Sequence, residues 1–458
     1  MAVGRRTVIS WCLFDWAISP HPTIVVTFVF SAYFAQGVVG NEIEGTVLWS
    51  QAIAAAGILV AIFSPLLGAI ADQSGRRKPW IATFSIACIL ATASLWFVTP
   101  NRSSIGLALI AVTISTICFE FVTVFYNATL SEVAPPNRIG RVGGWGWGAG
   151  YIGAIFCLSL CLFGLIQTNT PPFGLDPENA ETVRATVVVV ALWWILFGWP
   201  FFIFVPDRPG TGIGLVAAAK KGVPRLWRTL RNLRQHRQSA TFLIAQMLYA
   251  DGLATLFQFG GLYAAGTFGM SFAEIIQFGI AMNVTAGLGA FAFAWLDDAL
   301  GAKPTIMISL VGLIGFGAMV LVADSAHWFW VFGLSLSLFI GPVQSASRSL
   351  MVRLSPPDMR SEMFGLYALS GKSTSFLGPL MFGLVTAHFE SQRAGMATIL
   401  VFWAVGLTLL ALVRVKDNFR TGPEASDKIS PRILANGPTE AQARSMRVIG
   451  KEQGSRAP

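Results

Sequence analysis

The sequence has little charge for its length. Of its 458 residues, 12% are Asp, Glu, Lys or Arg, whereas 54% are hydrophobic. Soluble domains carry about 25% charged residues. A chain this poor in charge cannot cover a large fold with groups that water solvates, so the composition excludes an ordinary soluble protein and predicts that the bilayer is the solvent.

Metal ligands and nucleotide-binding loops are scarce as well. The five cysteines fall inside apolar runs without metal-site or disulfide spacing, and the four histidines lie in different segments. The glycine run from Gly143 to Gly153 has no strand before it and no lysine after it, which argues against a phosphate-binding loop. We therefore predict no cofactor, no metal site and no enzymatic activity, and interpret these glycines as points of close helix approach.

What the chain does have is long apolar runs near the ~20 residues that cross a bilayer. Twelve such segments are centred on Val25, Gly57, Leu90, Ser115, Ile155, Leu192, Phe257, residues 277–286, Leu313, Leu336, Leu377 and Ala404. Lipid offers no partners to an exposed backbone, so each segment is predicted to be a helix. The expected fold is an all-α integral membrane protein with twelve transmembrane helices.

The distribution of basic residues predicts the orientation. Of the 32 lysines and arginines, all but Arg102, Arg184, Arg393 and the mid-span Lys372 lie in alternate hydrophilic segments, which include both ends. The positive-inside rule then places both termini in the cytoplasm. The net charge of +9 is thus explained by topology and not by nucleic acid. The first apolar run has no small-residue cleavage site, so it is expected to remain in the protein.

The longest predicted cytoplasmic connection divides the spans six and six. We expect a six-helix bundle in residues 1–205, a linker in 206–238, a second six-helix bundle in 239–415 and a disordered polar tail in 416–458. Within the linker, arginines repeat every third residue from Arg225 to Arg234 with leucines between them. This pattern predicts a basic amphipathic helix on an anionic leaflet. The alternative is a solvated linker helix with a topogenic role only.

Three short motifs recur in the same order in the two halves. The pairs are residues 72–79 with 298–304, residues 134–138 with 355–360, and Asp15 and Ser19 with Asp251 and Thr255. Each offset is near half the chain length. Two parallel six-helix pseudo-repeats around a central site are the layout of a major facilitator transporter.

The segment "GAIADQSGRRKP" (residues 68–79) resembles the signature of the major facilitator superfamily, although Gln73 stands where that signature usually has arginine. The stretches "FDWAIS", "FYNATLSEVAPPNRIGRVGGWGWGAGYIG" and "LYADGLATLF" resemble the branch that contains autophagy-associated vacuolar amino-acid effluxers and bacterial permeases of unassigned substrate. The similarity covers about residues 8 to 415. It implies transport and leaves the cargo open.

In the major facilitator arrangement the first, fourth, seventh and tenth helices line the central cavity. The resemblance therefore places Asp15, Glu120, Asp251 and Arg348 at that cavity. A charge at membrane depth is costly and usually faces a partner or a wet cavity. We predict that the three carboxylates bind substrate or protons, with a purely structural role as the alternative for Asp15 and Asp251. For Arg348 we predict a gating or topogenic role.

Further substrate-site candidates are uncharged or lie deeper in the second half. Lys372, in the middle of the eleventh span, is a candidate anchor for a substrate carboxylate, with helix pairing or snorkelling as alternatives. Asn127, Gln258, Asn283 and Gln344 are candidates for substrate hydrogen bonds, and interhelical bonding is the alternative for each.

The loop between the second and third spans predicts a gate. Asp72 and Arg76 are expected to bridge helices on the cytoplasmic side, with Gly75 allowing a tight turn. The other members of this predicted gate are Arg77, Asp298 and Lys303.

The first span contains two prolines close to Asp15. Pro20 and Pro22 each remove a backbone donor, so we predict an irregular first helix whose freed carbonyls find other partners. His21, between them, is expected to make an interior hydrogen bond or to join a proton relay.

Together these features predict a secondary active, proton-coupled transporter of a small polar organic solute, such as an amino acid. The alternatives are an uncoupled facilitator and a transporter-derived sensor or scaffold. The expected partners are the solute, protons and the lipid bilayer, without nucleic acid, and the chain is expected to be a monomer. The absence of an organelle-targeting extension suggests a bacterial inner membrane.

Overall fold

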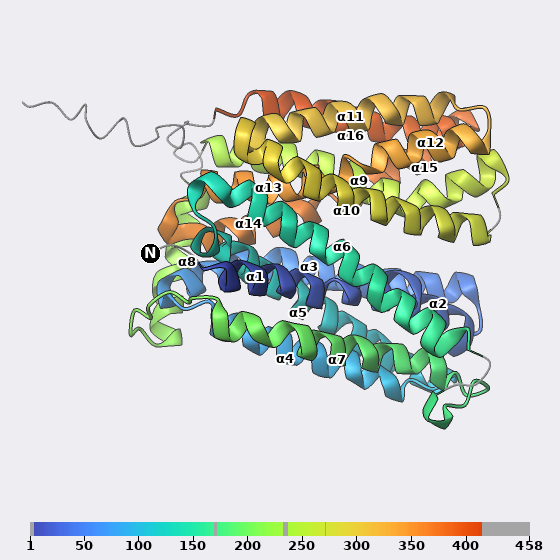
Figure 1. Cartoon of the computed structure of the whole chain (residues 1–458), viewed down its shortest axis with the longest axis horizontal. Coiled ribbons are helices and arrows are strands. Elements are labelled where there is room, and N and C mark those ends of the chain that lie inside the picture. Colours follow the sequence, from blue (N-terminus) through green and yellow to red (C-terminus); the bar gives the residue numbers. More distant parts are fainter. Residues whose placement is uncertain (1–3, 169–171, 232–236, 271, 415–458) are drawn as a thin grey trace, which may run out of the picture. The chain divides into compact units, whose positions relative to one another are not determined.

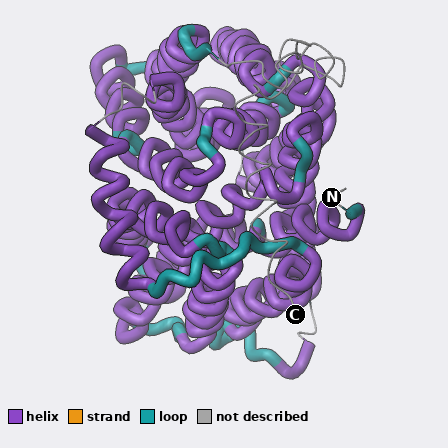
Figure 2. Tube along the Cα trace, turned by 90° about the vertical axis from the view of Figure 1, so that its left-hand side faces the viewer, coloured by secondary structure: helices purple, strands orange, loops and turns teal. Residues whose placement is uncertain are grey.

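The computed structural model describes residues 4–168, 172–231, 237–270 and 272–414. Within these ranges all regular secondary structure is helical (Figures 1 and 2). Residues Met1–Val415 form one compact unit. The predicted disorder of residues 416–458 lies outside the described residues, and the predicted division at residues 205 and 239 stays a prediction.

The N-terminal half, residues 1–205, consists of helices joined by short connections. They are α1 (Arg5–Ile18), η1 (His21–Phe28), α2 (Phe30–Tyr33), η2 (Phe34–Val39), α3 (Glu42–Ser74), α4 (Lys78–Ser94), η3 (Leu95–Phe97), η4 (Arg102–Ser104), α5 (Ile105–Val133), η5 (Pro136–Arg138), α6 (Ile139–Cys161), η6 (Leu162–Ile166), η7 (Pro172–Gly174) and α7 (Glu181–Phe204).

The linker and the C-terminal half, residues 239–415, follow the same pattern. Their helices are α8 (Leu215–Arg231), α9 (Arg237–Phe268), α10 (Phe272–Leu300), α11 (Ala302–Val322), α12 (Ala326–Ser337), α13 (Ile340–Leu354), η8 (Pro357–Met359), α14 (Arg360–Ser373), α15 (Leu377–Phe389) and α16 (Gln392–Ala411).

Eleven helical segments in the described part of the chain are long and apolar enough to cross a membrane. They coincide with predicted spans, so the all-helical membrane fold is confirmed. The exception is the predicted span around Leu377, where a turn interrupts the chain between α14 and α15, and α15 has only 13 residues. A single continuous helix is therefore wrong there, and α14 and α15 together supply the eleventh of the twelve predicted crossings.

The first span is irregular, as the prolines predict. α1 ends at Ile18, and a π-helix, η1, follows from His21. Pro20 has no backbone N–H to donate to the carbonyl of Trp16, and the Trp193 side chain donates to that oxygen instead, at 3.2 Å from Nε1. A side chain of α7 thus satisfies a carbonyl that the irregular helix leaves free.

His21 does not make the predicted hydrogen bond. Its imidazole is buried and stacks on Phe119, with 5.3 Å between the ring centroids. Both ring nitrogens lack a hydrogen-bond partner among the described residues. The participation of His21 in a proton relay stays a prediction.

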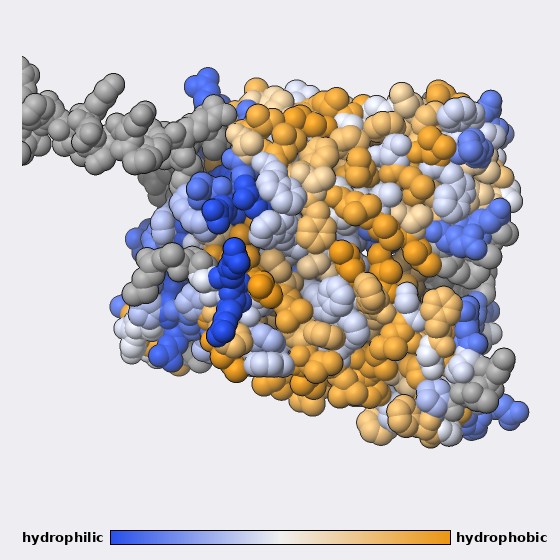
Figure 3. Space-filling model, in the orientation of Figure 1, coloured by the Kyte–Doolittle hydropathy of each residue, from blue (hydrophilic) through white to orange (hydrophobic). Residues whose placement is uncertain are grey.

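The surface has an apolar band between two polar ends (Figure 3). Large apolar side chains such as Ile58, Leu90 and Leu192 are well exposed in it, as expected for a surface that contacts lipid. One end carries the basic loops predicted to face the cytoplasm. We call it the basic end, and it comprises residues 75–77, 135–138, 206–214 and 355–359.

Glycines bring the two halves together. The most extensive helix contacts between the halves are those of α3 with α14 and of α6 with α10. A Cβ on Gly144 of α6 would lie 2.7 Å from the carbonyl oxygen of Ala290, and one on Gly148 would lie 2.5 Å from the ring of Phe291. The glycine run of α6 therefore permits close helix approach, as the sequence indicated.

Candidate functional site

The candidate site is built around Arg348, which α13 holds in the interior with 1% of its surface exposed. Its Nη1 lies 3.2 Å from Oδ2 of Asp15 and donates to Oδ1 of Asn127 at 3.0 Å. Its Nη2 donates to the carbonyl oxygen of Gly143. Three helices of the N-terminal half thus bind one guanidinium of the C-terminal half.

Aromatic rings enclose this ion pair. The guanidinium carbon of Arg348 lies 4.9 Å from the ring centroid of Trp11 and 5.1 Å from that of Trp147. The hydroxyl of Tyr126 donates to Oδ2 of Asp15 at 2.8 Å. Cation–π contacts are worth about 2 kcal/mol when desolvated. The rings stabilise the positive charge of Arg348 in a place from which water is excluded.

The ion pair between Asp15 and Arg348 opposes separation of the two halves at this point. Asp15 and Arg348 belong to different halves, so separation of the halves at this point would break their ion pair. Removing one partner of a buried ion pair costs about 3–5 kcal/mol because the other charge stays buried and unpaired. A proton on Asp15, or a ligand with charges of its own, would lower that cost.

Gln344 lies one helical turn before Arg348 on α13. Its Oε1 accepts hydrogen bonds from Nε1 of Trp147 at 3.0 Å and from the hydroxyl of Tyr151 at 2.8 Å. Both partners belong to α6, so these are bonds between the halves. They match the interhelical alternative, and a substrate role for Gln344 stays a prediction.

Asp251, the repeat equivalent of Asp15, has a different environment. Its Oδ2 accepts from the backbone N–H of Gly378 at 3.1 Å, in the first turn of α15. Its Oδ1 is buried and has no hydrogen-bond partner among the described residues. Asp251 therefore satisfies a free N–H at the break in the eleventh crossing. This contact is the structural alternative that the sequence left open.

The remaining substrate-site candidates are spread over several helices. Glu120 is half-buried on α5, two turns before Asn127, and Gln258 is exposed on α9. Nδ2 of Asn283 donates to the carbonyl of Gly279 at 2.8 Å, which is a bond within its own helix. The side chain of Lys372 lies outside what the structure describes. Substrate or proton binding by these four residues stays a prediction.

A second polar cluster lies at the basic end, and it corrects one prediction. The partner of Asp72 is Arg77 and not Arg76: Nη2 of Arg77 lies 3.1 Å from Oδ1 of Asp72. Arg76 is exposed. Arg77 is the N-cap residue of α4, and its buried side chain also pairs with Glu132 of α5.

This cluster also joins the two halves. Nε of Arg77 donates to Oγ of Ser361 at 2.8 Å, and Oδ2 of Asp72 accepts from the backbone N–H of Glu362 at 2.9 Å. Ser361 and Glu362 both belong to the first turn of α14. The signature loop of the N-terminal half is thus fastened to the C-terminal half.

Asp298 and Lys303, the residues of the second half that correspond to the signature loop, have partners in different halves. Oδ2 of Asp298 lies 3.3 Å from Nε of Arg141 on α6, which is another ion pair between the halves. Lys303 donates to the carbonyl of Ala411 at 2.8 Å, at the end of α16. Asp298 therefore joins the halves, whereas Lys303 ties two helices of one half.

Sequence reasoning missed several members of these clusters. They are Trp11, Tyr126, Glu132, Arg141, Trp147 and Ser361. Aromatic residues make up 12% of the chain, so a single tyrosine or tryptophan carries no signal. Glu132 and Arg141 flank the "APPNR" repeat motif. Their closeness to a repeated motif was the one signal in the sequence that could have identified them as members of the clusters.

The turn at Gly75 leads to a testable expectation. Its φ is +84°, and a Cβ there would lie 2.6 Å from the carbonyl oxygen of Pro209. We expect Gly75→Ala to destabilise the fold by about 1–2 kcal/mol, the cost of a left-handed backbone for a residue with a Cβ. Thermal unfolding in detergent measures this. Gly106→Ala is the control, because nothing lies within 4 Å of its Cβ position, and an equal loss in both variants would contradict the expectation.

Two family models match the chain. The model described as "Vacuole effluxer Atg22 like" matches residues 131–422. The model of the Major Facilitator Superfamily matches residues 2–158. The two matches overlap within α5 and α6, which hold Asn127 and Gly143 of the candidate site.

Curated relatives agree with these models. The uncharacterized MFS-type transporter YxiO of Bacillus subtilis is 26% identical over 415 residues, which cover 88% of this chain and 94% of that protein. Autophagy-related protein 22-1 of Neosartorya fischeri is 27% identical over 319 residues, which cover 64% of this chain and 51% of that protein. The chain thus spans about half the length of its fungal relatives.

Solved structures show the same fold at low identity. The MFS transporter FucP in the outward conformation has a TM-score of 0.69 at 14% identity, covering 90% of this chain and 99% of its own. The proton:xylose symporter XylE has a TM-score of 0.67 at 14% identity, and the match covers 89% of this chain and 94% of the XylE chain. At this identity the likeness concerns the fold alone.

Proposed function

Because the chain belongs to the vacuole effluxer Atg22-like family of major facilitator transporters, we propose that it moves a small amino-acid-like solute coupled to protons. It is a multi-pass membrane transporter and not an enzyme. The description of the family as effluxers supports export as the direction of transport. The solute, the coupling and the direction are the proposed part.

The proposed mechanism is alternating access by rocking of the two halves. The basic end faces the cytoplasm, as the distribution of lysine and arginine supports. Asp72, Arg77, Arg141 and Asp298 fasten the halves there. Breaking and remaking such pairs switches a transporter between two discrete arrangements.

The buried pair of Asp15 and Arg348 carries the proposal. A zwitterion such as an amino acid has an ammonium group that suits Asp15 and a carboxylate that suits the guanidinium of Arg348. It could replace each residue's present partner when the halves separate. Solute binding would then lower the cost of breaking the pair, and this links occupancy to movement.

A proton can also replace Arg348 as the partner of Asp15. A protonated Asp15 would leave Arg348 free for the solute, and Asp251 and Glu120 are further proton carriers on helices that line the proposed cavity. We therefore propose that these carboxylates exchange protons during the cycle, while Arg348 keeps its charge.

Purified protein in liposomes with an internal pH dye tests the coupling. We expect an amino-acid gradient to drive proton movement in the wild type, and Glu120→Gln or Asp251→Asn to reduce it at least tenfold. The side-chain amide that Asp251→Asn introduces can still accept from the N–H of Gly378, so this variant keeps the structural contact and removes only the charge.

The outcomes separate the proposals. Solute exchange without proton movement in the wild type would indicate an uncoupled facilitator. Unchanged proton movement in both variants would remove Glu120 and Asp251 from the coupling. A solute gradient that drives no flux with any amino acid or small organic acid would contradict the proposed cargo class.

A further inference from the structure

The linker helix α8 lies against the basic end, and one of its faces packs on the protein. Ala218 and Leu226 of this face are buried, and a Cβ on Gly222 would lie 2.8 Å from the carbonyl oxygen of Ala69 in α3. Leu226 therefore packs on the protein and not on a leaflet, and the predicted contact of α8 with an anionic leaflet stays a prediction. The residue Arg234 of the predicted pattern lies outside the described residues. Two other faces of α8 carry exposed side chains that no described residue covers.

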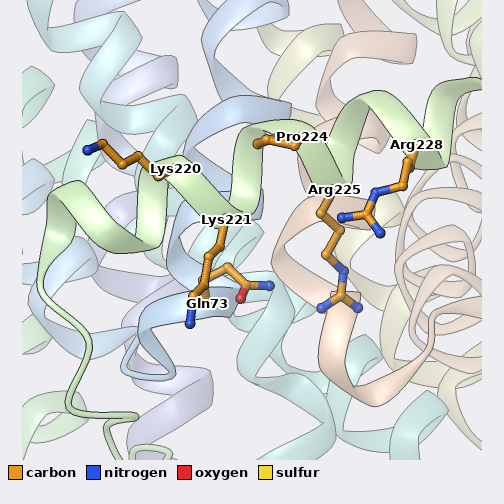
Figure 4. A pocket seen from close by; sticks show the side chains of 6 residues that line it. All are labelled: Gln73, Lys220, Lys221, Pro224, Arg225 and Arg228. Carbon is orange, nitrogen blue, oxygen red and sulfur yellow. The ribbon is translucent and has the colours of Figure 1, made fainter.

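The second face of α8 borders a basic groove. The groove has a volume of about 520 Å³ and is lined by Gln73, Lys220, Lys221, Pro224, Arg225 and Arg228 (Figure 4). Figure 4 shows Lys221 beside Gln73 at one end of the groove, with Arg225 and Arg228 at the other. All the charged groups that line it are positive.

One of these four cations is already paired with acidic groups of the C-terminal half. Arg225 pairs with Asp358, and its Nε lies 4.0 Å from Oε2 of Glu362. The hydrogen bond from Arg225 lowers the pKa of the Asp358 carboxyl, so this pair stays charged at neutral pH. Lys220, Lys221 and Arg228 are exposed and join no ion pair within the described ranges.

The third face is apolar and exposed. Val216 and Trp227 are 71% and 68% exposed, although both are hydrophobic. They are 11 residues apart, close to three full helical turns, so they lie on one stripe of α8. Tryptophan beside basic residues is typical of the membrane–water interface. α8 also connects α7 and α9, which both belong to candidate membrane spans.

We propose that this groove binds the phosphate headgroup of an anionic phospholipid, with Val216 and Trp227 inserted beside it at the interface. Lys220, Lys221 and Arg228 line one groove and join no ion pair among the described residues, and each basic group near an anionic surface adds to the attraction. A soluble phosphate would use the cations but would leave the apolar stripe in water. The segment after Val415 is a poor occupant, because its eight lysines and arginines exceed its five acidic residues.

The test uses the full chain, purified in detergent and stripped of lipid. Phosphatidylglycerol with a fluorescent acyl chain is titrated, and binding is followed by energy transfer from tryptophan. The groove variant combines Lys220→Gln, Lys221→Gln and Arg228→Gln. The matched control combines Arg5→Gln, Arg138→Gln and Arg237→Gln, which removes three exposed basic groups outside the groove.

We expect the groove variant to bind phosphatidylglycerol about tenfold more weakly, and the control to stay within about twofold of wild type. Lys221→Gln alone should give a smaller loss in the same direction, which guards against a folding defect in the triple variant. Phosphatidylcholine, which has no net charge, should bind weakly to all of them.

Two results would overturn the proposal. An equal loss in the control variant would indicate diffuse attraction by net charge and no specific groove. Displacement of the lipid by millimolar inorganic phosphate, with binding unaffected by Val216→Ser and Trp227→Ser, would indicate a soluble phosphate ligand in place of a lipid. Neither result depends on the identity of the transported solute.

Discussion

Arg348→Gln is expected to abolish solute transport and to lower the stability of the protein by about 3–5 kcal/mol, because it leaves Asp15 buried without its cation. Glutamine also loses the cation–π contacts with Trp11 and Trp147. Uptake into proteoliposomes measures the first effect, and thermal unfolding in detergent measures the second.

A double variant distinguishes the ion pair from simple packing. Asp15→Asn with Arg348→Gln removes both charges, so it should recover much of the lost stability while transport stays absent. Arg237→Gln, an exposed arginine at the start of α9, serves as the control and should change neither quantity. If the double variant is as unstable as the single one, the ion pair is not the source of the loss. If Arg348→Gln transports normally, the proposed role of the pair is wrong.

Gly68→Ala is expected to shift the protein toward a state that is open at the basic end. A Cβ on Gly68 of α3 would overlap the carbonyl oxygen of Ser361 in α14. The obstacle is backbone, which cannot rotate away as a side chain can. Gly365 of α14 has the reciprocal contact, because a Cβ there would overlap the carbonyl oxygen of Ser64. Overpacking of this kind costs about 1–3 kcal/mol, and separating α3 from α14 relieves it.

Spin labels at Asn137→Cys in η5 and Arg237→Cys at the start of α9, both exposed, would measure this shift as a longer mean distance. A difference of about 1–3 kcal/mol changes the ratio of the two states by about fivefold to 150-fold. Gly315→Ala is the matched control, because nothing lies within 4 Å of its Cβ position. An unchanged distance in Gly68→Ala would mean that α3 and α14 do not separate in the cycle.

The repeat between the halves was visible in the sequence, but the residues that it pairs do not have the same surroundings in the structure. Asp15 and Asp251 occupy matching positions in the motif, and both are buried. In the structure Asp15 pairs with an arginine of the other half, whereas Asp251 accepts from a backbone N–H of its own half. The repeat determines which helix carries a carboxylate, and the neighbouring helices determine what the carboxylate meets.

The choice between two adjacent arginines as the partner of Asp72 shows why the site could not be predicted. Arg76 and Arg77 are adjacent and chemically identical, and the sequence favoured Arg76 as the partner of Asp72. Both lie in the non-helical turn between α3 and α4. After the turn at Gly75, the local backbone exposes Arg76 and directs Arg77, the N-cap residue of α4, inward to Asp72 and Ser361.

The sequence by itself determined the membrane setting, the number and order of the crossings, the basic end and the family. These properties depend on apolar length, on the spacing of charges along the chain and on local motifs, all of which are one-dimensional. The tertiary structure alone decided that Arg348 meets Asp15, 333 residues away, that the eleventh crossing is broken, and that α8 leaves a basic groove uncovered. Those outcomes depend on the rotation and packing of whole helices, because a buried charge takes as its partner whichever group the neighbouring helix presents.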